Sequence, residues 1–224
     1  IRQIDSIETF LRLNSDGLMI AGSSLMNDMS PNRQLLTETL WLYREKVRRF
    51  YRELTDYNNG FRPFEICRDG FKFKLDDMET VSVQGYGLDM VFEKWPDFAK
   101  YLSGGWFEEF VYLQCKPYED AGVIQDLRIN VKLNLSLEES KGYSSFGVEY
   151  SELDITFTDG YSLYIVECKA GNVTQEQIMK LQNLVRFYGG IEGRGIIACC
   201  VPPNTESAKK KIKRSEEHTS ELQS

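Results

Sequence analysis

Two carboxylates and an amine, Asp154, Glu167 and Lys169, are close together in the sequence where a β-hairpin is expected. Strand-forming residues flank Asp159-Gly160, a dipeptide that favours a two-residue type I′ turn. Because side chains alternate between the faces of a strand, Glu167 and Lys169 share a face, and the hairpin brings Asp154 to the same side. Such a group is costly to assemble unless it has a use, such as binding a hard cation.

The turn also predicts how the two strands pair. A two-residue loop pairs Thr158 with Tyr161. Asp154 then lies opposite Ile165, with Glu167 as its diagonal neighbour. Carboxylate oxygens suit Mg²⁺ or Mn²⁺ better than Zn²⁺, so the sequence predicts that this pair binds one of these two ions.

The composition limits the alternatives. The one histidine among the 224 residues is His218. It lies in residues 214–224, RSEEHTSELQS, which resemble the translation of a sequencing adapter and which we expect to be an artefact tail. Without another histidine the chain has no Ser-His-Asp, Cys-His, HNH or HD type site. The net charge of −7 is unlike that of proteins that bind nucleic acid through bulk charge, so such binding would need a local basic patch.

The general class of protein is also indicated. A hydrophobic content of 42% is typical of a packed globular protein. The five cysteines form no C-x-x-C pair, which favours reduced thiols in a cytoplasmic protein. The longest apolar runs fall short of eighteen residues, so no membrane segment is expected.

Around the hairpin, hydrophobic periodicity predicts a helix at 106–114, a long strand at 123–135, a helix at 174–188, a strand at 195–201 and a short basic helix at 208–213. Helix, three strands, helix and strand make an α/β core with a mixed sheet, in which a helical crossover joins the hairpin to a parallel strand. Thr174 and Gln177 form a capping box at the start of the second helix. On that helix Gln177 and Lys180 either face a phosphate or belong to a solvated face.

The first half of the chain predicts a helical segment followed by short strands. We expect a helix at 5–13, a loop at 14–29, a long helix from Ser30-Pro31 to about residue 58, strands at 64–67, 71–75 and 81–84, and a helix at 93–102 that Gly104-Gly105 ends.

The charged residues of the hairpin, together with the order of helices and strands around it, resemble the PD-(D/E)XK nuclease superfamily. Its core places an acidic residue on one strand and Glu/Asp-x-Lys on the next, here Asp154 and Glu167-Cys168-Lys169. The resemblance implies a restriction-endonuclease-like αβββαβ fold and metal-dependent hydrolysis of phosphodiester bonds. It also implies that the main-chain carbonyl of Cys168 is a further metal ligand, and that Lys169 lies near the attacking water or a phosphate oxygen.

A fourth acid in this superfamily comes from the first core helix. The pattern G-x-x-[FL]-E matches residues 104–108, so the resemblance implies Glu108 as a catalytic metal ligand. Glu109 is the alternative, although the helix dipole by itself favours glutamates in a first turn.

The motifs GGWFEEFVY, ELDI, LYIVECK and KLQNL, with Gly-Arg-Gly before the last strand, look like the nuclease domain of Card1/Can2-type CRISPR ancillary nucleases. The resemblance implies a homodimer in which an N-terminal CARF domain binds a cyclic oligoadenylate and activates cleavage of DNA, and in some members RNA. On this basis we expect residues 1–60 to be a helical remnant or linker to a missing N-terminal domain, 61–95 a small β-rich connector and 96–213 the nuclease domain. The alternatives are a restriction or repair nuclease of the same superfamily, or a non-catalytic module that binds nucleic acid.

Overall fold

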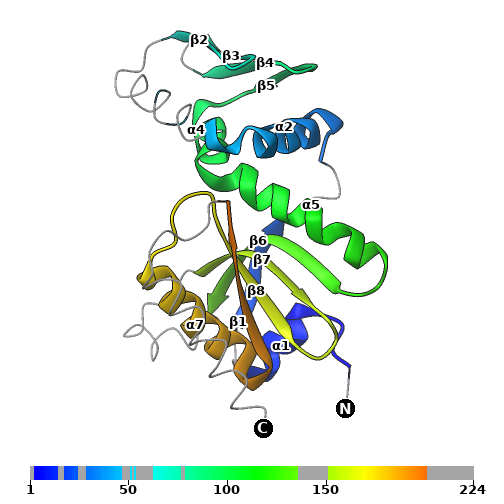
Figure 1. Cartoon of the computed structure of the whole chain (residues 1–224). Coiled ribbons are helices and arrows are strands. Elements are labelled where there is room, and N and C mark those ends of the chain that lie inside the picture. Colours follow the sequence, from blue (N-terminus) through cyan, green and yellow to red (C-terminus); the bar gives the residue numbers. More distant parts are fainter. Residues whose placement is uncertain are drawn as a thin grey trace. The chain divides into compact units, whose positions relative to one another are not determined.

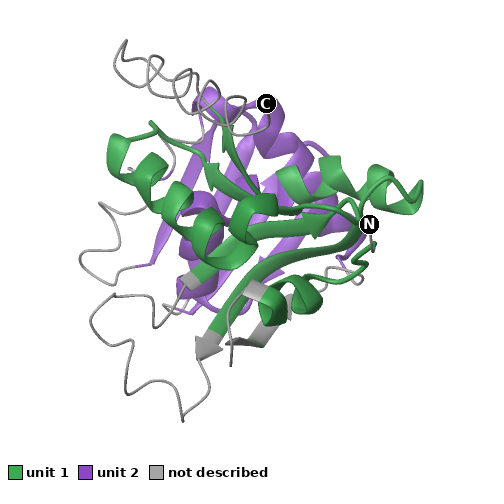
Figure 2. Cartoon of the chain, turned by 90° about the horizontal axis from the view of Figure 1, so that it is seen from below, with its two compact units in different colours: residues 1–26, 111–224 green, residues 27–110 purple. Residues whose placement is uncertain are grey.

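The computed structural model describes residues 3–14, 18–24, 29–46, 51, 53, 63–76, 79–135 and 151–200 (Figure 1). The chain divides into two compact units (Figure 2), unit 1 with residues 1–26 and 111–224, and unit 2 with residues 27–110. The domain limits predicted at residues 60, 95 and 213 differ from these divisions and stay a prediction. The helix expected at 208–213 and the tail at 214–224 lie outside the described residues.

Unit 1 is built on a five-stranded mixed sheet in the order β1-β6-β7-β8-β9. Its strands are β1 (Leu18–Ser24), β6 (Gln125–Leu135), β7 (Ser151–Thr158), β8 (Leu163–Lys169) and β9 (Gly193–Cys199). Neighbouring strands are antiparallel except β8 and β9, which are parallel. The α/β class and the mixed sheet are therefore confirmed.

The strand β1 corrects the prediction of a loop over residues 14–29. Its sequence, LMIAGSS, is short and ends in glycine and serine, which gives a weak local signal. Antiparallel pairing with β6 makes it a strand, because tertiary context overrides weak strand propensity.

Two helices of unit 1, α1 (Ile7–Asn14) and α7 (Gln175–Gly189), contact each other and the sheet (Figure 1). Apolar side chains from both helices and from β6, β7 and β8 form one buried cluster, comprising Ile7, Phe10, Leu11, Val131, Leu133, Leu153, Leu163, Ile165, Leu181, Leu184 and Tyr188. The strand β8 is buried at nearly every position, as expected for a strand inside a sheet.

The hairpin of β7 and β8 has a longer loop than its Asp-Gly dipeptide predicts. Thr158 pairs with Leu163, so four residues form the loop, and the predicted pairing is wrong by two residues. The physical reason is the side chain of Asp159, whose Oδ1 accepts hydrogen bonds from the N–H groups of Tyr161 and Ser162 at 2.9 and 2.7 Å. A shift of two residues keeps every side chain on its predicted face.

Unit 2 contains a four-stranded antiparallel meander, β2 (Phe64–Arg68), β3 (Phe71–Asp76), β4 (Thr80–Gly85) and β5 (Leu88–Phe92). The first three strands are confirmed, and β5 was not predicted. The helix α2 (Pro31–Leu42) begins as expected, with the side chain of Ser30 accepting a hydrogen bond from the N–H of Arg33. It ends at Leu42, but residues 44–46, 51 and 53 are again helical, so the predicted long helix is interrupted at Tyr43, and its other residues up to 58 lie outside the described residues.

The predicted helix break at Gly104-Gly105 is wrong. The helix α4 (Trp95–Lys100) continues through a π-helical segment (Tyr101–Gly105) into α5 (Trp106–Asp120). Neither glycine has a positive φ, so both take helical conformations, and the wider π turn accommodates them. The boundary between the two units falls within α5.

Among the described residues, no helix is long and apolar enough to cross a membrane.

Candidate active site

The carboxylates of Asp154 and Glu167 come together where β7 and β8 separate. The last paired residues of the ladder at this end are Ile155 and Val166, and the next step of the same register places Asp154 directly opposite Glu167. The backbone N–H of Cys168 donates a hydrogen bond of 2.7 Å to Oδ2 of Asp154. The expected proximity is therefore confirmed, with a directly opposed pair in place of a diagonal one.

The surroundings of Asp154 favour its neutral form. Burial, followed by the negative charge of Glu167, raises the pKa of Asp154 to about 6. The hydrogen bond from Cys168 and the positive charges of Lys169 and Lys180 act in the opposite direction but do not cancel this shift. Two opposed, largely buried carboxylates are an arrangement that a divalent cation would stabilise.

Lys169 is paired with the second carboxylate. Its Nζ lies 2.5 Å from Oε1 of Glu167, and the side chain of Glu167 is only 9% exposed. Burial alone would lower the pKa of Lys169, but the hydrogen bond and negative charge of Glu167 outweigh burial and raise it. Lys169 is therefore a cation at neutral pH, as a group that neutralises phosphate charge must be.

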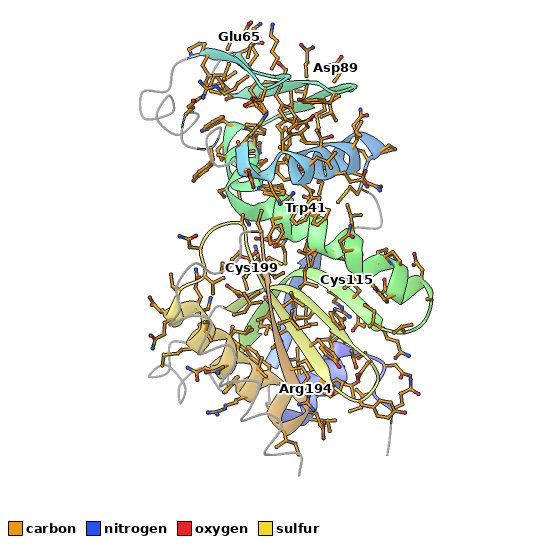
Figure 3. The ribbon with its side chains drawn as sticks, in the orientation of Figure 1. Trp41, Glu65, Asp89, Cys115, Arg194 and Cys199 are labelled. Atoms are coloured by element: carbon orange, nitrogen blue, oxygen red, sulfur yellow. The ribbon has the colours of Figure 1, made fainter. Side chains whose placement is uncertain are left out.

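This group lies at the carboxyl ends of two parallel strands. Lys169 at the end of β8 pairs with Cys199 at the end of β9, and the N–H of Cys200 donates to the carbonyl of Lys169 at 3.0 Å. Figure 3 labels Cys199 at this end of β9 and Arg194 near its start. After β8 the chain leads into α7. The carboxyl ends of strands are where α/β sheets usually place their ligands.

The helix α7 carries Gln177 and Lys180, the two residues that the sequence predicts to contact nucleic acid. Thr174 and Gln177 form the expected capping box, in which Oε1 of Gln177 accepts from the N–H of Thr174 at 3.0 Å. Gln177 therefore has a local structural role, and its contact with nucleic acid stays a prediction. Lys180 is exposed, and its charge acts on Asp154, which places it on the same side of unit 1 as the carboxylates.

The two glutamates of α5 have different surroundings within unit 2. Glu109 is 9% exposed and accepts hydrogen bonds from Arg33 and Thr37, so its oxygens are already used. Glu108 is only partly buried in the same helical turn, and its place in the metal site stays a prediction. The partner Arg33 was missed, because it lies 76 residues from Glu109 and no local pattern links them.

The donors present fit a small hard cation. Within the parts of the chain that the structure describes, no group of three or more His, Cys, Asp or Glu side chains is placed to bind a metal. Mg²⁺, however, is often held by one or two carboxylates, with water and substrate phosphates completing its shell. Asp154 and Glu167, with the carbonyl of Cys168, match that chemistry.

A comparison with protein families decides the assignment. Residues 97–219, more than half of the chain, match the model of the Card1-like endonuclease domain. The chain belongs to this family. The match spans β6 to β9 and α7, and so includes Asp154, Glu167 and Lys169. The chain therefore carries an endonuclease domain. No curated protein matches it.

Two solved structures share the fold of this Card1-like chain. The crystal structure of protein VC1899 from Vibrio cholerae matches 97% of this chain and 57% of its own, with a TM-score of 0.63 and 17% identity. Can2 from Sulfobacillus thermosulfidooxidans, solved in complex with cyclic tetra-adenylate, matches 93% of this chain and 53% of its own, with a TM-score of 0.60 and 16% identity. The chain spans little more than half the length of these structures.

Proposed function

We propose that this chain is the nuclease part of a CRISPR-associated defence effector that cleaves DNA in a reaction dependent on Mg²⁺ or Mn²⁺. The observation that carries the proposal is the opposed pair of Asp154 and Glu167 beside protonated Lys169, in a chain of the Card1-like endonuclease family. The family supports the reaction class, and the donor set supports the dependence on a metal.

Each residue of the site has a defined role in this proposal. Asp154, Glu167 and the carbonyl of Cys168 would hold the cation. A bound divalent cation would act as a Lewis acid on the phosphate. Lys169 keeps its proton, because Glu167 raises its pKa, and neutralises the charge that develops on a phosphate oxygen.

Lys180 is the proposed contact for the nucleic-acid backbone. Among the described residues, none forms an ion pair with Lys180. Its side chain is exposed on α7, and its positive charge acts on Asp154. An acidic chain needs such a local cation to bring phosphates towards two carboxylates. RNA is a second substrate of the same chemistry.

Control by a cyclic oligoadenylate is also part of the proposal. The Can2 structure was solved with cyclic tetra-adenylate, and the similarity covers 53% of that chain. We place the binding site for such a ligand in a CARF domain outside the matched region, and the active protein is a homodimer.

The test is cleavage of supercoiled and single-stranded DNA in the presence of Mn²⁺. We expect Asp154→Asn, Glu167→Gln and Lys169→Met each to reduce the rate by more than about a hundredfold, because each removes charge that the reaction needs. Glu152→Gln is the matched control, since it changes an exposed carboxylate on the same strand and should retain activity. Full cleavage by all three site variants would show that the proposed site is wrong.

A further inference from the structure

The ion pair of Lys169 and Glu167 lies at the proposed cation site and is largely shielded from water. Nζ of Lys169 is 2.5 Å from Oε1 of Glu167, close enough for a charge-assisted hydrogen bond. The two side chains are 23% and 9% exposed, so solvent screens their attraction less than it would in a surface pair. A cation that takes Oε1 must therefore displace a strongly held ammonium group.

The backbone fixes where both side chains begin, but it does not fix the ammonium group. Glu167 and Lys169 are two residues apart on β8 and so share a face of the strand. Parallel pairing with β9 holds this backbone, and the carbonyl of Lys169 accepts a hydrogen bond from the N–H of Cys200 at 3.0 Å. The four-carbon stem of a lysine is flexible, so Nζ can leave Glu167 while the strand stays in place.

Asp154 is held by a different kind of contact. Its Oδ2 accepts a hydrogen bond of 2.7 Å from the backbone N–H of Cys168, which no side-chain movement removes. A carboxylate has about four acceptor sites, so Asp154 can keep this bond and also bind a cation. At Glu167, in contrast, the ammonium group and a divalent cation on the same oxygen would repel each other. Glu167 is therefore the carboxylate at which Lys169 and a cation compete.

We propose that Lys169 competes with the divalent cation for Glu167, so that the cation binds tightly only when Lys169 turns to a substrate phosphate. The inference rests on the proposed function, in which Asp154 and Glu167 hold the cation and Lys169 neutralises phosphate charge. A phosphate offers the ammonium group another anion, and its departure frees Oε1 of Glu167. Substrate and cation therefore strengthen each other's binding by the same factor, as linkage requires. Without substrate, the ion pair keeps the cation affinity low.

The first test is Mn²⁺ binding by Lys169→Met without DNA, measured by titration calorimetry at about pH 8, where carboxylate ligands are readily deprotonated. Because the variant lacks the competing ammonium group, it should bind Mn²⁺ about tenfold more tightly than the wild type, within the usual range of coupling between two ligands. Lys169→Gln keeps a polar side chain beside Glu167 and should show a similar gain. Far-ultraviolet circular dichroism confirms that each variant is folded.

Lys180→Met is the matched control, because it removes one positive charge from the same side of unit 1. Lys180 is exposed, its charge acts on Asp154, and no described residue forms an ion pair with it. Solvent screens such a charge, so the Mn²⁺ affinity should change by less than about twofold. General repulsion between the cation and nearby lysines would instead raise the affinity of both variants alike.

The ammonium group can also be followed directly by ¹⁵N NMR of the lysine side chains, with Lys169→Arg identifying the signal of Lys169. Saturating Mg²⁺, which is diamagnetic, should shift this signal in the wild type and leave it unchanged in Asp154→Asn. In EDTA, a short oligothymidylate should shift the same signal, because its phosphates draw Nζ away from Glu167.

Three results would overturn the proposal: Mn²⁺ binding by Lys169→Met no tighter than by the wild type, equal gains in Lys169→Met and Lys180→Met, or a Lys169 signal that either saturating Mg²⁺ or oligothymidylate leaves unchanged. Asp154→Asn in the calorimetric titration separates this failure from failure of the proposed function. If Asp154→Asn abolishes Mn²⁺ binding, the metal site stands and only the competition is wrong. If Asp154→Asn binds Mn²⁺ as well as the wild type, the metal site itself is wrong.

Discussion

Asp154 and Glu167 repel each other across the hairpin in the absence of a cation. Burial and the charge of Glu167 raise the pKa of Asp154 to about 6, so the folded protein holds a proton that the unfolded chain releases at lower pH. The carboxylate therefore costs stability at neutral pH. Residues that reduce stability in this way are typical of functional sites.

Asp154→Asn should consequently stabilise the metal-free protein. The contribution of Asp154 to the stability of the wild type falls as the pH rises from about 4 to about 6, since its raised pKa means that this group binds more protons in the folded state than in the unfolded state in this interval. At pH 7 to 8 in EDTA, the variant should gain about 1–3 kcal/mol in the free energy of unfolding. Urea denaturation at several pH values measures this, and a gain that persists undiminished at pH 4 would contradict it.

Lys169 is expected to act as a cation and not as a general base. Its raised pKa keeps the proton on Nζ at neutral pH. Lys169→Arg, which preserves the charge, should then retain more cleavage activity than Lys169→Met. A general base would be lost equally in both variants, since arginine does not deprotonate. The initial rate of DNA cleavage with Mn²⁺ distinguishes the two roles.

At the level of elements, close packing of α7 on β9 places Lys180 beside the hairpin. Gly193 permits this approach, because a Cβ there would lie 2.5 Å from the carbonyl oxygen of Val185. Gly195 has a similar role, with side-chain atoms of Val185 and Leu181 at 3.0 and 3.2 Å. The glycines at the start of β9 therefore have a packing function.

Gly193→Ala should lower the free energy of unfolding by about 1–3 kcal/mol, the usual cost of overpacking. Gly105→Ala is the matched control. A Cβ at Gly105 would make only an ordinary contact of 3.6 Å, so alanine in this helical segment should be neutral or stabilise by up to about 1 kcal/mol. Thermal denaturation of both variants tests the contrast, and equal effects would argue against close packing at Gly193.

For the molecule as a whole, metal binding and stability should be linked. A cation that binds only the folded state stabilises it, by about 2.7 kcal/mol at a concentration one hundred times Kd. Because the carboxylate of Asp154 must lose its proton to bind a cation, this gain should shrink below about pH 6. Thermal shifts with Mn²⁺ at pH 5 and pH 8 measure the effect, and Asp154→Asn should abolish the shift at pH 8.

The sequence by itself determined the αβββαβ order, the faces of the hairpin and the capping box of α7. These features depend on alternation, helical periodicity and residues three positions apart, which are local properties of the chain. The same local signals placed Asp154, Glu167 and Lys169 on one side, and this survived an error of two residues in the pairing because faces repeat every second residue.

Only the tertiary structure decided the strand β1, the four-residue loop at Asp159 and the structural role of Glu109. The strand β1 forms because β6 pairs with it. The side chain of Asp159 captures two backbone N–H groups and lengthens the loop. Glu109 is used by Arg33, a partner 76 residues away. Each outcome depends on a contact between residues whose interaction no local pattern specifies, which is why sequence periodicity could not predict it.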